Sequence, residues 1–275
     1  MATKDRRNEM LRDSWRSEMS YEAIVIEHNN GVDYVTLNRP NELNALSPQM
    51  VTELRDYFGE LAFNQKVRIV VLKGAGRAFC AGLDLKGSLD VDTVEPALRS
   101  QREVSEIMIR MRRCPQPIIS LLKGPVCGGG FAMALASDIR IAGESAKMNA
   151  AFMKLGLSGC DVGVSYHLPR LVGSAIASEL LLTGRFIYAD RALRVGLVSD
   201  VVTDDALEEA GEVFVKEMLA TSAVGLRLTK EALNMNADAP SLESAIAMED
   251  RNQVVCLQGE DFRKQLDAFL TKSST

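Results

Sequence analysis

The chain has 275 residues, of which 47% are hydrophobic and 25% are charged, and its formal net charge is −5. These values are ordinary for a globular protein with one large or two small domains, and the acidic balance argues against a nucleic-acid partner. No apolar run approaches the ~20 residues that span a bilayer, so we expect no membrane partner.

The first 20 residues mix basic and acidic side chains and contain no apolar segment. This composition argues against a secretory or organelle-targeting signal, and it predicts a solvated extension over residues 1–20. The cysteines stand at positions 80, 114, 127, 160 and 256, without a CxxC pair. A disulfide framework or a metal site is therefore not expected, and a reduced cytoplasmic location is predicted.

Regular elements of both kinds are predicted along the first half of the chain. Residues 21–38 form two strand-like runs around Asn29-Asn30-Gly31, which is a hairpin signal. Ser47 and Pro48 open a helix that continues to about Leu61. Later segments are predicted as strands at 67–73, 117–123 and 138–141, a loop at 87–95, and a mostly helical stretch at 91–113.

After Gly173 the pattern is mainly helical. The predicted helices cover 174–183, 188–195, 204–220, 223–235, 241–256 and 259–271, with a short strand at 197–202. Strands alternate with helices first and helices follow last, which predicts an α/β core with a helical C-terminal region. We therefore expect a core domain at 21–203 and a helical region at 204–275.

Three consecutive glycines, Gly128 to Gly130, lie between an apolar strand and an Ala-rich helix. Glycine lets backbone approach a ligand closely, and the first amides of a helix have no internal partners. Such a turn can hold an anion, or an oxygen that becomes one. The spacing fits neither the phosphate loop GxxxxGK[ST] nor the dinucleotide motif GxGxxG.

A second glycine turn, RAFCAGLDLK at 77–86, also follows an apolar strand. One glycine turn alone favours simple close packing of a helix. Two turns can present two backbone amides to one oxygen, which is an oxyanion hole.

The glycine turns belong to a longer series of segments that occur in order. These are VTLNRPNELNALS at 35–47, VLKGAGRAFCAGLDLK at 71–86, PIISLLKGPVCGGGFAMALASDIRIAGESAKM at 117–148, LPRLVG at 168–173, ELLLTGRFIYADRALRVGLVSDVV at 179–202, and LTKEALN at 228–234. With them the chain resembles the enoyl-CoA hydratase/isomerase (crotonase) superfamily over about residues 21–270.

The resemblance implies the crotonase fold, a ββα superhelix with two roughly perpendicular sheets and a helical C-terminal trimerisation region. It also implies an acyl-CoA substrate in fatty acid metabolism, a homotrimer or a hexamer built as a dimer of trimers, and lyase or isomerase activity. No metal or redox cofactor is implied, because coenzyme A arrives as part of the substrate.

The same resemblance assigns the site. The backbone amides of Leu83 and Gly129 would hold the thioester oxygen as it becomes an enolate. The residues expected to line the CoA and acyl path are Glu42, Leu43, Ala81, Leu83, Asp84, Leu85, Lys86, Gly129 and Phe152. For Lys86, a phosphate or ribose contact and a plain exposed lysine are equally good readings.

The chain departs from a hydratase at two positions. Family hydratases use two glutamates to hold and deprotonate water and to protonate the α-carbon. Those places are taken by Ala132 and Phe152, which cannot exchange a proton.

One carboxylate, Asp161, remains nearby. The corresponding aspartate shuttles a proton in dienoyl-CoA isomerases and is the nucleophile in aroyl-CoA dehalogenases. Burial would raise the pKa of such a carboxyl. The alternative is a structural N-cap for a helix at 162–171.

Polar side chains on the 96–113 helix, Ser105 and Glu106, are weaker candidates. Glu103 and Glu106 have Arg102 and Arg110 at helical spacing, which favours a solvated charged face.

Isomerisation of a double bond is the preferred function, because one carboxylate suffices for a 1,3-proton shift. Three alternatives remain at this point. They are an enoyl-CoA hydratase with atypical residues, an acyl-CoA-binding protein that has lost catalysis, and covalent catalysis by Asp161.

Overall fold

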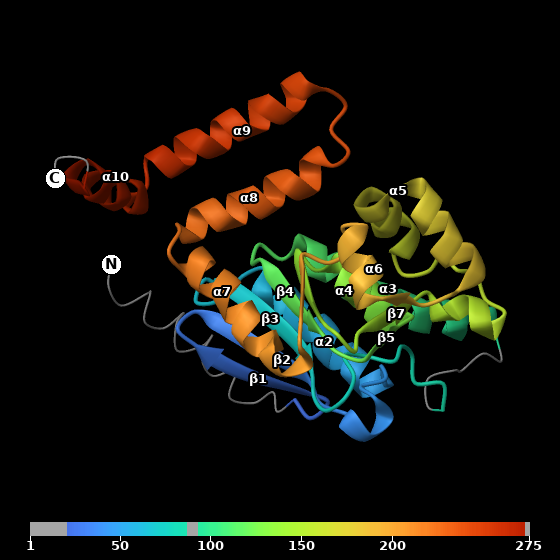
Figure 1. The fold of residues 1–275 in the computed structure, drawn as a ribbon. Helices are drawn as coiled ribbons and strands as arrows, with labels where there is room; N and C mark the ends of the chain where they lie inside the picture. The colour runs from blue at the N-terminus through green and yellow to red at the C-terminus, as the bar shows by residue number, and fades with distance from the viewer. Residues whose placement is uncertain (1–20, 87–92, 273–275) are drawn as a thin grey trace.

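A computed structural model describes residues 21–86 and 93–272 (Figure 1). A six-stranded sheet has the order β1-β2-β3-β4-β6-β9, and a smaller sheet has the order β5-β7-β8. The large sheet contains β1 (Ile24–Asn29), β2 (Val32–Leu37), β3 (Ile69–Gly74), β4 (Ile118–Leu122), β6 (Ile139–Gly143) and β9 (Asp200–Val202). The small sheet contains β5 (Pro125–Cys127), β7 (Lys147–Asn149) and β8 (Ile187–Tyr188).

The predicted hairpin is confirmed, since β1 and β2 pair antiparallel. Asn30 and Gly31 both have positive φ, 47° and 79°, as a tight two-residue turn requires. From β2 onward, neighbouring strands of the large sheet run parallel. Their carboxyl ends therefore lie along one edge of the sheet, where connecting turns can meet.

Helix α2 (Pro48–Leu61) begins as predicted, because Ser47 Oγ accepts the Met50 amide at 3.2 Å. Its nearly buried Glu53 ties it to the start of β1. The Glu53 carboxylate accepts the backbone amides of residues 22, 23 and 24 at 2.9 to 3.1 Å. Three charge-assisted bonds to neighbouring amides replace the water that this carboxylate loses on burial.

Most of the remaining helices follow the predicted order. They are α3 (Val94–Arg113), α4 (Gly129–Ala136), α5 (Val164–Thr183), α6 (Ala189–Arg194) and α7 (Leu207–Leu219). Short 3₁₀ turns lie at η1 (Pro40–Glu42), η2 (Ala151–Leu155) and η3 (Asp204–Ala206). Helix α5 joins two segments across a kink at Gly173, where φ is 78° and ψ is 162°.

Two predicted segments, the extension at 1–20 and the loop at 87–95, fall wholly or mostly outside the described residues. The end of that loop was predicted wrongly, because Val94 and Glu95 already belong to α3. Within the described ranges, no helix is both long and apolar enough to cross a membrane.

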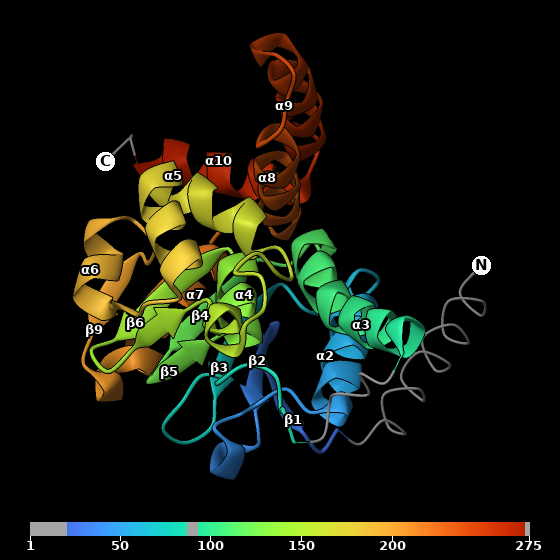
Figure 2. The same ribbon diagram turned by 90° about the vertical axis from the view of Figure 1, so that its right-hand side faces the viewer.

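The parallel strands are apolar on both faces, as strands covered by helices on both sides are. On one face, Ile69 and Val71 pack with Leu207 and Val215 of α7. On the other, Val70 and Leu72 join the larger core. Helices α2 and α3 lie side by side and α4 packs against α3 on this second side (Figure 2).

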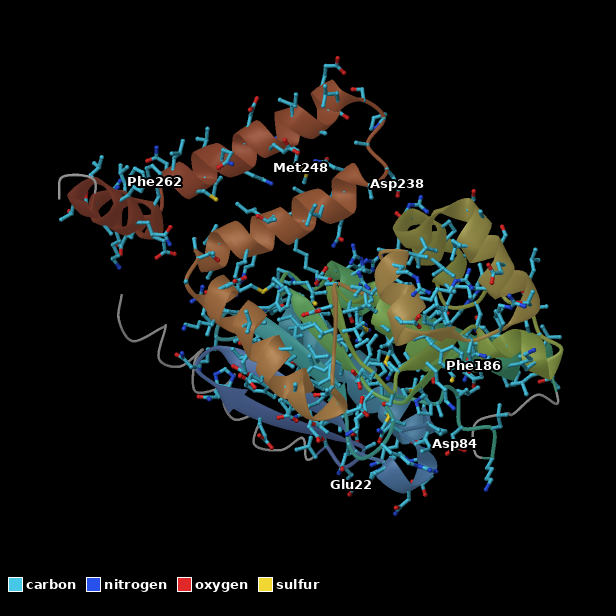
Figure 3. The ribbon with its side chains drawn as sticks, viewed as in Figure 1. Glu22, Asp84, Phe186, Asp238, Met248 and Phe262 are labelled. Carbon is cyan, nitrogen blue, oxygen red and sulfur yellow. The ribbon has the colours of Figure 1, made fainter. Side chains whose placement is uncertain are left out.

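The last helices project from the core (Figures 1 and 2). They are α8 (Ala223–Asn236), α9 (Leu242–Leu257) and α10 (Glu260–Lys272), and α9 contains no buried residue. Asp238 follows α8 and bonds to Tyr166 and Arg170 of α5 (Figure 3). This contact ties the end of α8 to the core.

A buried lysine ties the middle of α8 to the core. Lys230 is 4% exposed, and its Nζ donates to the carbonyl oxygens of Met111 at 3.0 Å and Gln116 at 2.8 Å. It also pairs with the Asp138 carboxylate at 2.9 Å. An ammonium group has three donors, and here three oxygens receive them.

Replacing Lys230 by alanine should destabilise the fold by about 3 kcal/mol, because two carbonyls and a carboxylate lose their shared partner. Urea-induced unfolding measures this loss. The matched control is Lys216→Ala on the exposed side of α7, which should change stability by less than about 0.5 kcal/mol. Equal behaviour of the two variants would contradict the anchoring role of Lys230.

Candidate active site

The first glycine turn is held by a backbone pairing with Leu46. The Leu46 amide donates to the Gly82 carbonyl at 2.8 Å, and the Asp84 amide donates to the Leu46 carbonyl at 3.1 Å. This is a parallel bridge between Leu46 and Leu83. Since residues 82 and 84 supply the bonds to Leu46, the amide of Leu83 points to the opposite side.

The second glycine turn lies close against the first. The Cys127 amide donates to the Cys80 carbonyl at 2.9 Å. A Cβ placed on Gly82 would lie 3.1 Å from the Cys127 carbonyl oxygen, and one placed on Gly128 would lie 3.7 Å from the Gly82 Cα. Both glycines have positive φ, 104° and 51°, so a side chain at either would be strained, and one at Gly82 would also be crowded.

Several backbone amides in these turns donate to no protein acceptor within the described part of the chain, and those of Leu83 and Gly129 are among them. The first intrahelical bond of α4 runs from the Ala132 amide to the Gly128 carbonyl at 3.0 Å, so the Gly129 amide precedes the helical ladder. In the described ranges, neither Leu83 nor Gly129 donates its N–H to a protein acceptor. Two free donors on touching turns suit an oxygen that gains negative charge.

Asn44, which the sequence reasoning missed, holds the first turn in place. It is fully buried, and its Oδ1 accepts the Arg39 amide at 2.9 Å. Its Nδ2 donates to the carbonyls of Ala75 and Ala78 at 2.9 and 2.8 Å. The sequence feature that could have pointed to Asn44 is an asparagine between apolar residues. The backbone of Asn44 is left-handed, with φ 55°, and asparagine tolerates this conformation.

The residues expected to contact CoA come together from two segments. Ala81 donates its amide to the Leu43 carbonyl at 3.0 Å, which joins the turn at 77–86 to η1. Glu42 ends η1, and Leu85 and Lys86 are exposed at the end of the turn, directly after Asp84, which Figure 3 labels. The bond between Ala81 and Leu43 therefore places Glu42 and Leu43 beside this turn.

The Asp84 side chain itself faces protein. Arg39 donates to its carboxylate at 2.9 Å, and this bond is the main reason that the pKa of Asp84 is lowered. The Lys86 amide donates to the other carboxylate oxygen at 3.1 Å. Asp84 therefore holds its own loop through both carboxylate oxygens.

Apolar side chains stand at both positions that the family resemblance assigns to the glutamates of hydratases. Ala132 is buried inside α4, at 1% exposure. Phe152 lies in η2, and its Cε1 would be 3.4 Å from a Cβ placed on Gly128. The second turn is thus flanked by an aromatic ring that can pack against an acyl group but cannot move a proton.

Asp161 lies in the segment between η2 and α5, and its Oδ1 accepts two hydrogen bonds. Gln101 of α3 donates through Nε2 at 2.5 Å, and the Val162 amide donates at 2.8 Å. Burial raises the pKa of Asp161, and the two bonds oppose that rise. Gln101 was not among the residues singled out from the sequence, because 60 positions separate it from Asp161.

The alternative structural role for Asp161 is wrong. Helix α5 begins at Val164, its N-cap is Gly163, and no side chain caps it. Asp161 meets this helix only through its backbone carbonyl, which accepts the Val164 amide at 2.9 Å. Its carboxylate is therefore not used to start the helix.

The charged residues of α3 form a charged face, as predicted. Glu106 pairs with Arg110 one turn later at 3.0 Å, and Arg55 of α2 lies 3.7 Å from Glu103. Ser105 donates to the Gln101 carbonyl at 3.0 Å within the helix. These contacts give neither Ser105 nor Glu106 a part in the arrangement around Asp161.

Known proteins match this chain along most of its length. A family model described as enoyl-CoA hydratase/isomerase matches residues 27–275. The probable enoyl-CoA hydratase echA12 of Mycobacterium bovis is 38% identical over 247 residues, which cover 87% of this chain and 86% of that protein. The 1,2-epoxyphenylacetyl-CoA isomerase of Escherichia coli K12 is 34% identical over 257 residues, which cover 92% and 97%.

The fold also matches solved structures. The crystal structure of enoyl-CoA hydratase from Bacillus anthracis superposes with a TM-score of 0.86 at 32% identity, over 91% of this chain and 97% of that one. This likeness confirms the predicted α/β crotonase fold with C-terminal helices.

Gly82→Ala should lower kcat for an enoyl-CoA about a hundredfold or more, because the new methyl group forces the two turns apart and misplaces an amide donor. Steady-state kinetics measure this loss. Gly196→Ala is the control, since Gly196 also has positive φ, 76°, but an added Cβ would meet nothing closer than 3.9 Å. A kcat for Gly82→Ala as high as that of the control would contradict the importance of the close approach.

Proposed function

The chain belongs to the enoyl-CoA hydratase/isomerase family, and from this membership we propose that it shifts a double bond in an acyl-CoA thioester, with Asp161 carrying the proton. Family membership makes it an acyl-CoA enzyme, a lyase or an isomerase. Isomerisation is chosen over hydration because the proposed site contains one proton-transferring carboxylate, that of Asp161. Asp161 is held by two hydrogen bonds, while apolar Ala132 and Phe152 occupy the places of the two hydratase acids.

In the proposed reaction a β,γ-enoyl thioester binds with its carbonyl oxygen between the amides of Leu83 and Gly129. The Asp161 carboxylate removes an α-proton, and the electron pair moves onto the thioester oxygen. The two amides stabilise that charge, and one such donor is worth about 3 to 4 kcal/mol of barrier. Asp161 then returns the proton to the γ-carbon, so the double bond becomes α,β and the carboxylate is regenerated.

The raised pKa of Asp161 suits this role, because a base that must later act as an acid works best when its pKa lies nearer the working pH. The elements involved also pack together, since α4 contacts both α3 and α5. We further propose that CoA passes along Glu42, Leu43, Ala81, Leu85, Lys86 and the backbone of Asp84, the edge where the Ala81–Leu43 bond joins two segments. Fatty acid metabolism is the corresponding setting.

Hydration is the second candidate, favoured by relatives that carry the name hydratase. It requires a water molecule to be oriented and deprotonated, which in the two-acid mechanism needs a second carboxylate. The product therefore distinguishes the two reactions. Hydration yields a β-hydroxyacyl-CoA, whereas isomerisation yields an α,β-enoyl-CoA of unchanged mass.

Asp161→Asn should lower kcat by about a hundredfold or more for isomerisation of β,γ-hexenoyl-CoA in D₂O, since an amide cannot accept the α-proton. Mass spectrometry of the product should find deuterium at the α- or γ-carbon with wild type, because the proton held by Asp161 exchanges with D₂O before it is delivered, and none with the variant. Asp205→Asn, an exposed aspartate in η3, is the matched control and should match wild type. Robust turnover or formation of β-hydroxyacyl-CoA by Asp161→Asn would overturn the proposal.

We also propose that the C-terminal helices assemble the chain into a trimer, or into two stacked trimers. In the single chain, large apolar side chains on these helices face solvent, including Leu233 at 70% and Phe269 at 68% exposure. Exposed apolar surface on the helices of a single chain is commonly covered by another chain. In a closed ring with rotational symmetry, a neighbouring chain covers each such surface.

Sedimentation equilibrium should therefore give the mass of three or six chains. The double substitution Leu233→Asp and Phe269→Asp should reduce it to one chain, because charges replace the apolar contacts. Phe63→Asp is the control, since Phe63 is 80% exposed but follows α2 on the core. An unchanged mass for the double variant would show that the assembly surface lies elsewhere.

A further inference from the structure

Both hydrogen bonds to the Asp161 carboxylate fall on the same oxygen. Gln101 Nε2 lies 2.5 Å from Oδ1 and the Val162 amide lies 2.8 Å from Oδ1. Among the described residues, Oδ2 accepts no hydrogen bond. The two oxygens of this carboxylate therefore differ in their surroundings.

We propose that Gln101 is a positioning residue, which together with the Val162 amide holds Oδ1 of Asp161 so that Oδ2 takes and returns the substrate proton. This inference rests on the proposed function, because it assigns the proton transfer of Asp161 to one atom. An oxygen that already accepts two N–H donors has less electron density to offer, so the unbonded oxygen is the better base.

The arrangement serves both protonation states of the carboxyl group. In the carboxylate, Oδ1 accepts both N–H groups. After the proton arrives on Oδ2, Oδ1 becomes the carbonyl oxygen of a neutral acid and can still accept them. Asp161 therefore needs no reorientation between removal of the α-proton and delivery to the γ-carbon.

The backbone that carries each holder is itself fixed. Gln101 projects from α3, which packs against α2 and α4. Val162 has φ 40°, an uncommon conformation for a β-branched residue, and its side chain is buried. Such a conformation persists when the surroundings enforce it, so the amide that meets Oδ1 is held by its own packing.

Few ionisable groups on the elements around Asp161 could add their own titration to the pH profile that is assigned to Asp161. One turn before and after Gln101, α3 carries the neutral residues Ala97, Leu98, Val104 and Ser105. Helix α4 has no ionisable side chain, and the adjoining segment offers only Cys160 beside Asp161. In the first turn of α5, burial and three arginines lower the pKa of His167 to about 4, so this imidazole is neutral at higher pH.

The sign of the expected effect follows from these contacts. Gln101 donates to the charged form of Asp161, so its removal should favour the neutral form and raise the pKa. Catalysis begins with the carboxylate, and activity therefore appears as pH rises through that pKa. In a plot of kcat/KM against pH, the low-pH limb therefore moves with any change in the pKa of Asp161.

Three substitutions at Gln101 should shift this limb in an ordered way. With β,γ-hexenoyl-CoA as the probe, Gln101→Ala should move it up by about half to one pH unit, the size of one lost hydrogen bond. Gln101→Glu should move it further up, because two neighbouring carboxylates resist joint ionisation. Gln101→Lys should move it down by about one unit, because a nearby cation favours the carboxylate.

Gln101→Ala should also lower kcat about tenfold with little change in KM, since Gln101 lies outside the residues proposed to meet CoA. Ser100→Ala, a neutral replacement on the same helix, is the control and should match wild type in all three quantities. Thermal unfolding of each variant tests folding separately. If Gln101 had a purely structural role, its substitutions would lower kcat, but Gln101→Glu and Gln101→Lys would not move the low-pH limb of kcat/KM in opposite directions.

The outcomes separate the two proposals. An ordered shift with an inactive Asp161→Asn supports the role of Gln101. An unmoved limb in the folded Gln101 variants, with Asp161→Asn still inactive, overturns the role of Gln101 alone. An active Asp161→Asn overturns the proposed function and this inference with it.

Discussion

The close approach of two backbone turns is the constraint on which the active site depends. Gly82 lies so near the Cys127 carbonyl that a single methyl group would not fit comfortably between them. Leu46 holds the first turn from the other side through its pairing with residues 82 and 84. Leu83 is therefore fixed between two strands of backbone, and its amide direction depends on no side-chain rotamer.

This arrangement separates two tasks of the enzyme. In the proposed mechanism, backbone atoms at Leu83 and Gly129 supply the donors for a developing negative charge, and no side chain takes part in that task. Side chains around the second turn decide what happens to the proton. Ala132, Phe152 and Asp161 can thus differ from those of a hydratase while the same thioester activation is kept.

Local signals predicted most of the fold, including the two glycine turns that the structure brings together. The Asn-Gly turn, the Ser-Pro helix start and the apolar strands before each glycine turn act over a few residues and can be read directly. Strands β5, β7 and β8 were missed, because two or three residues have no readable periodicity. The roles of Asn44 and Gln101 were also hidden, since their partners lie about 30 to 60 positions away in the chain.

Asp84 and the start of α5 show how tertiary contacts set the partners of single residues. The carboxylate of Asp84, which is proposed to lie beside CoA, pairs with Arg39. Asp161 was a reasonable helix cap by residue type, yet a glycine in the left-handed conformation precedes α5. Both cases depend on which polar partner is nearest after folding, and spacing along the chain does not reveal that.

The ammonium group of Lys230 also has a consequence for how the chain is made. Its acceptors on Met111 and Gln116 precede it by 119 and 114 positions. While the ribosome is still synthesising the later part, these two carbonyls have no ammonium group to bind, and Asp138 has only Arg112 as its cationic partner. The turn-bearing core is therefore incomplete until α8 has left the exit tunnel, so final consolidation of this protein awaits the last fifth of translation.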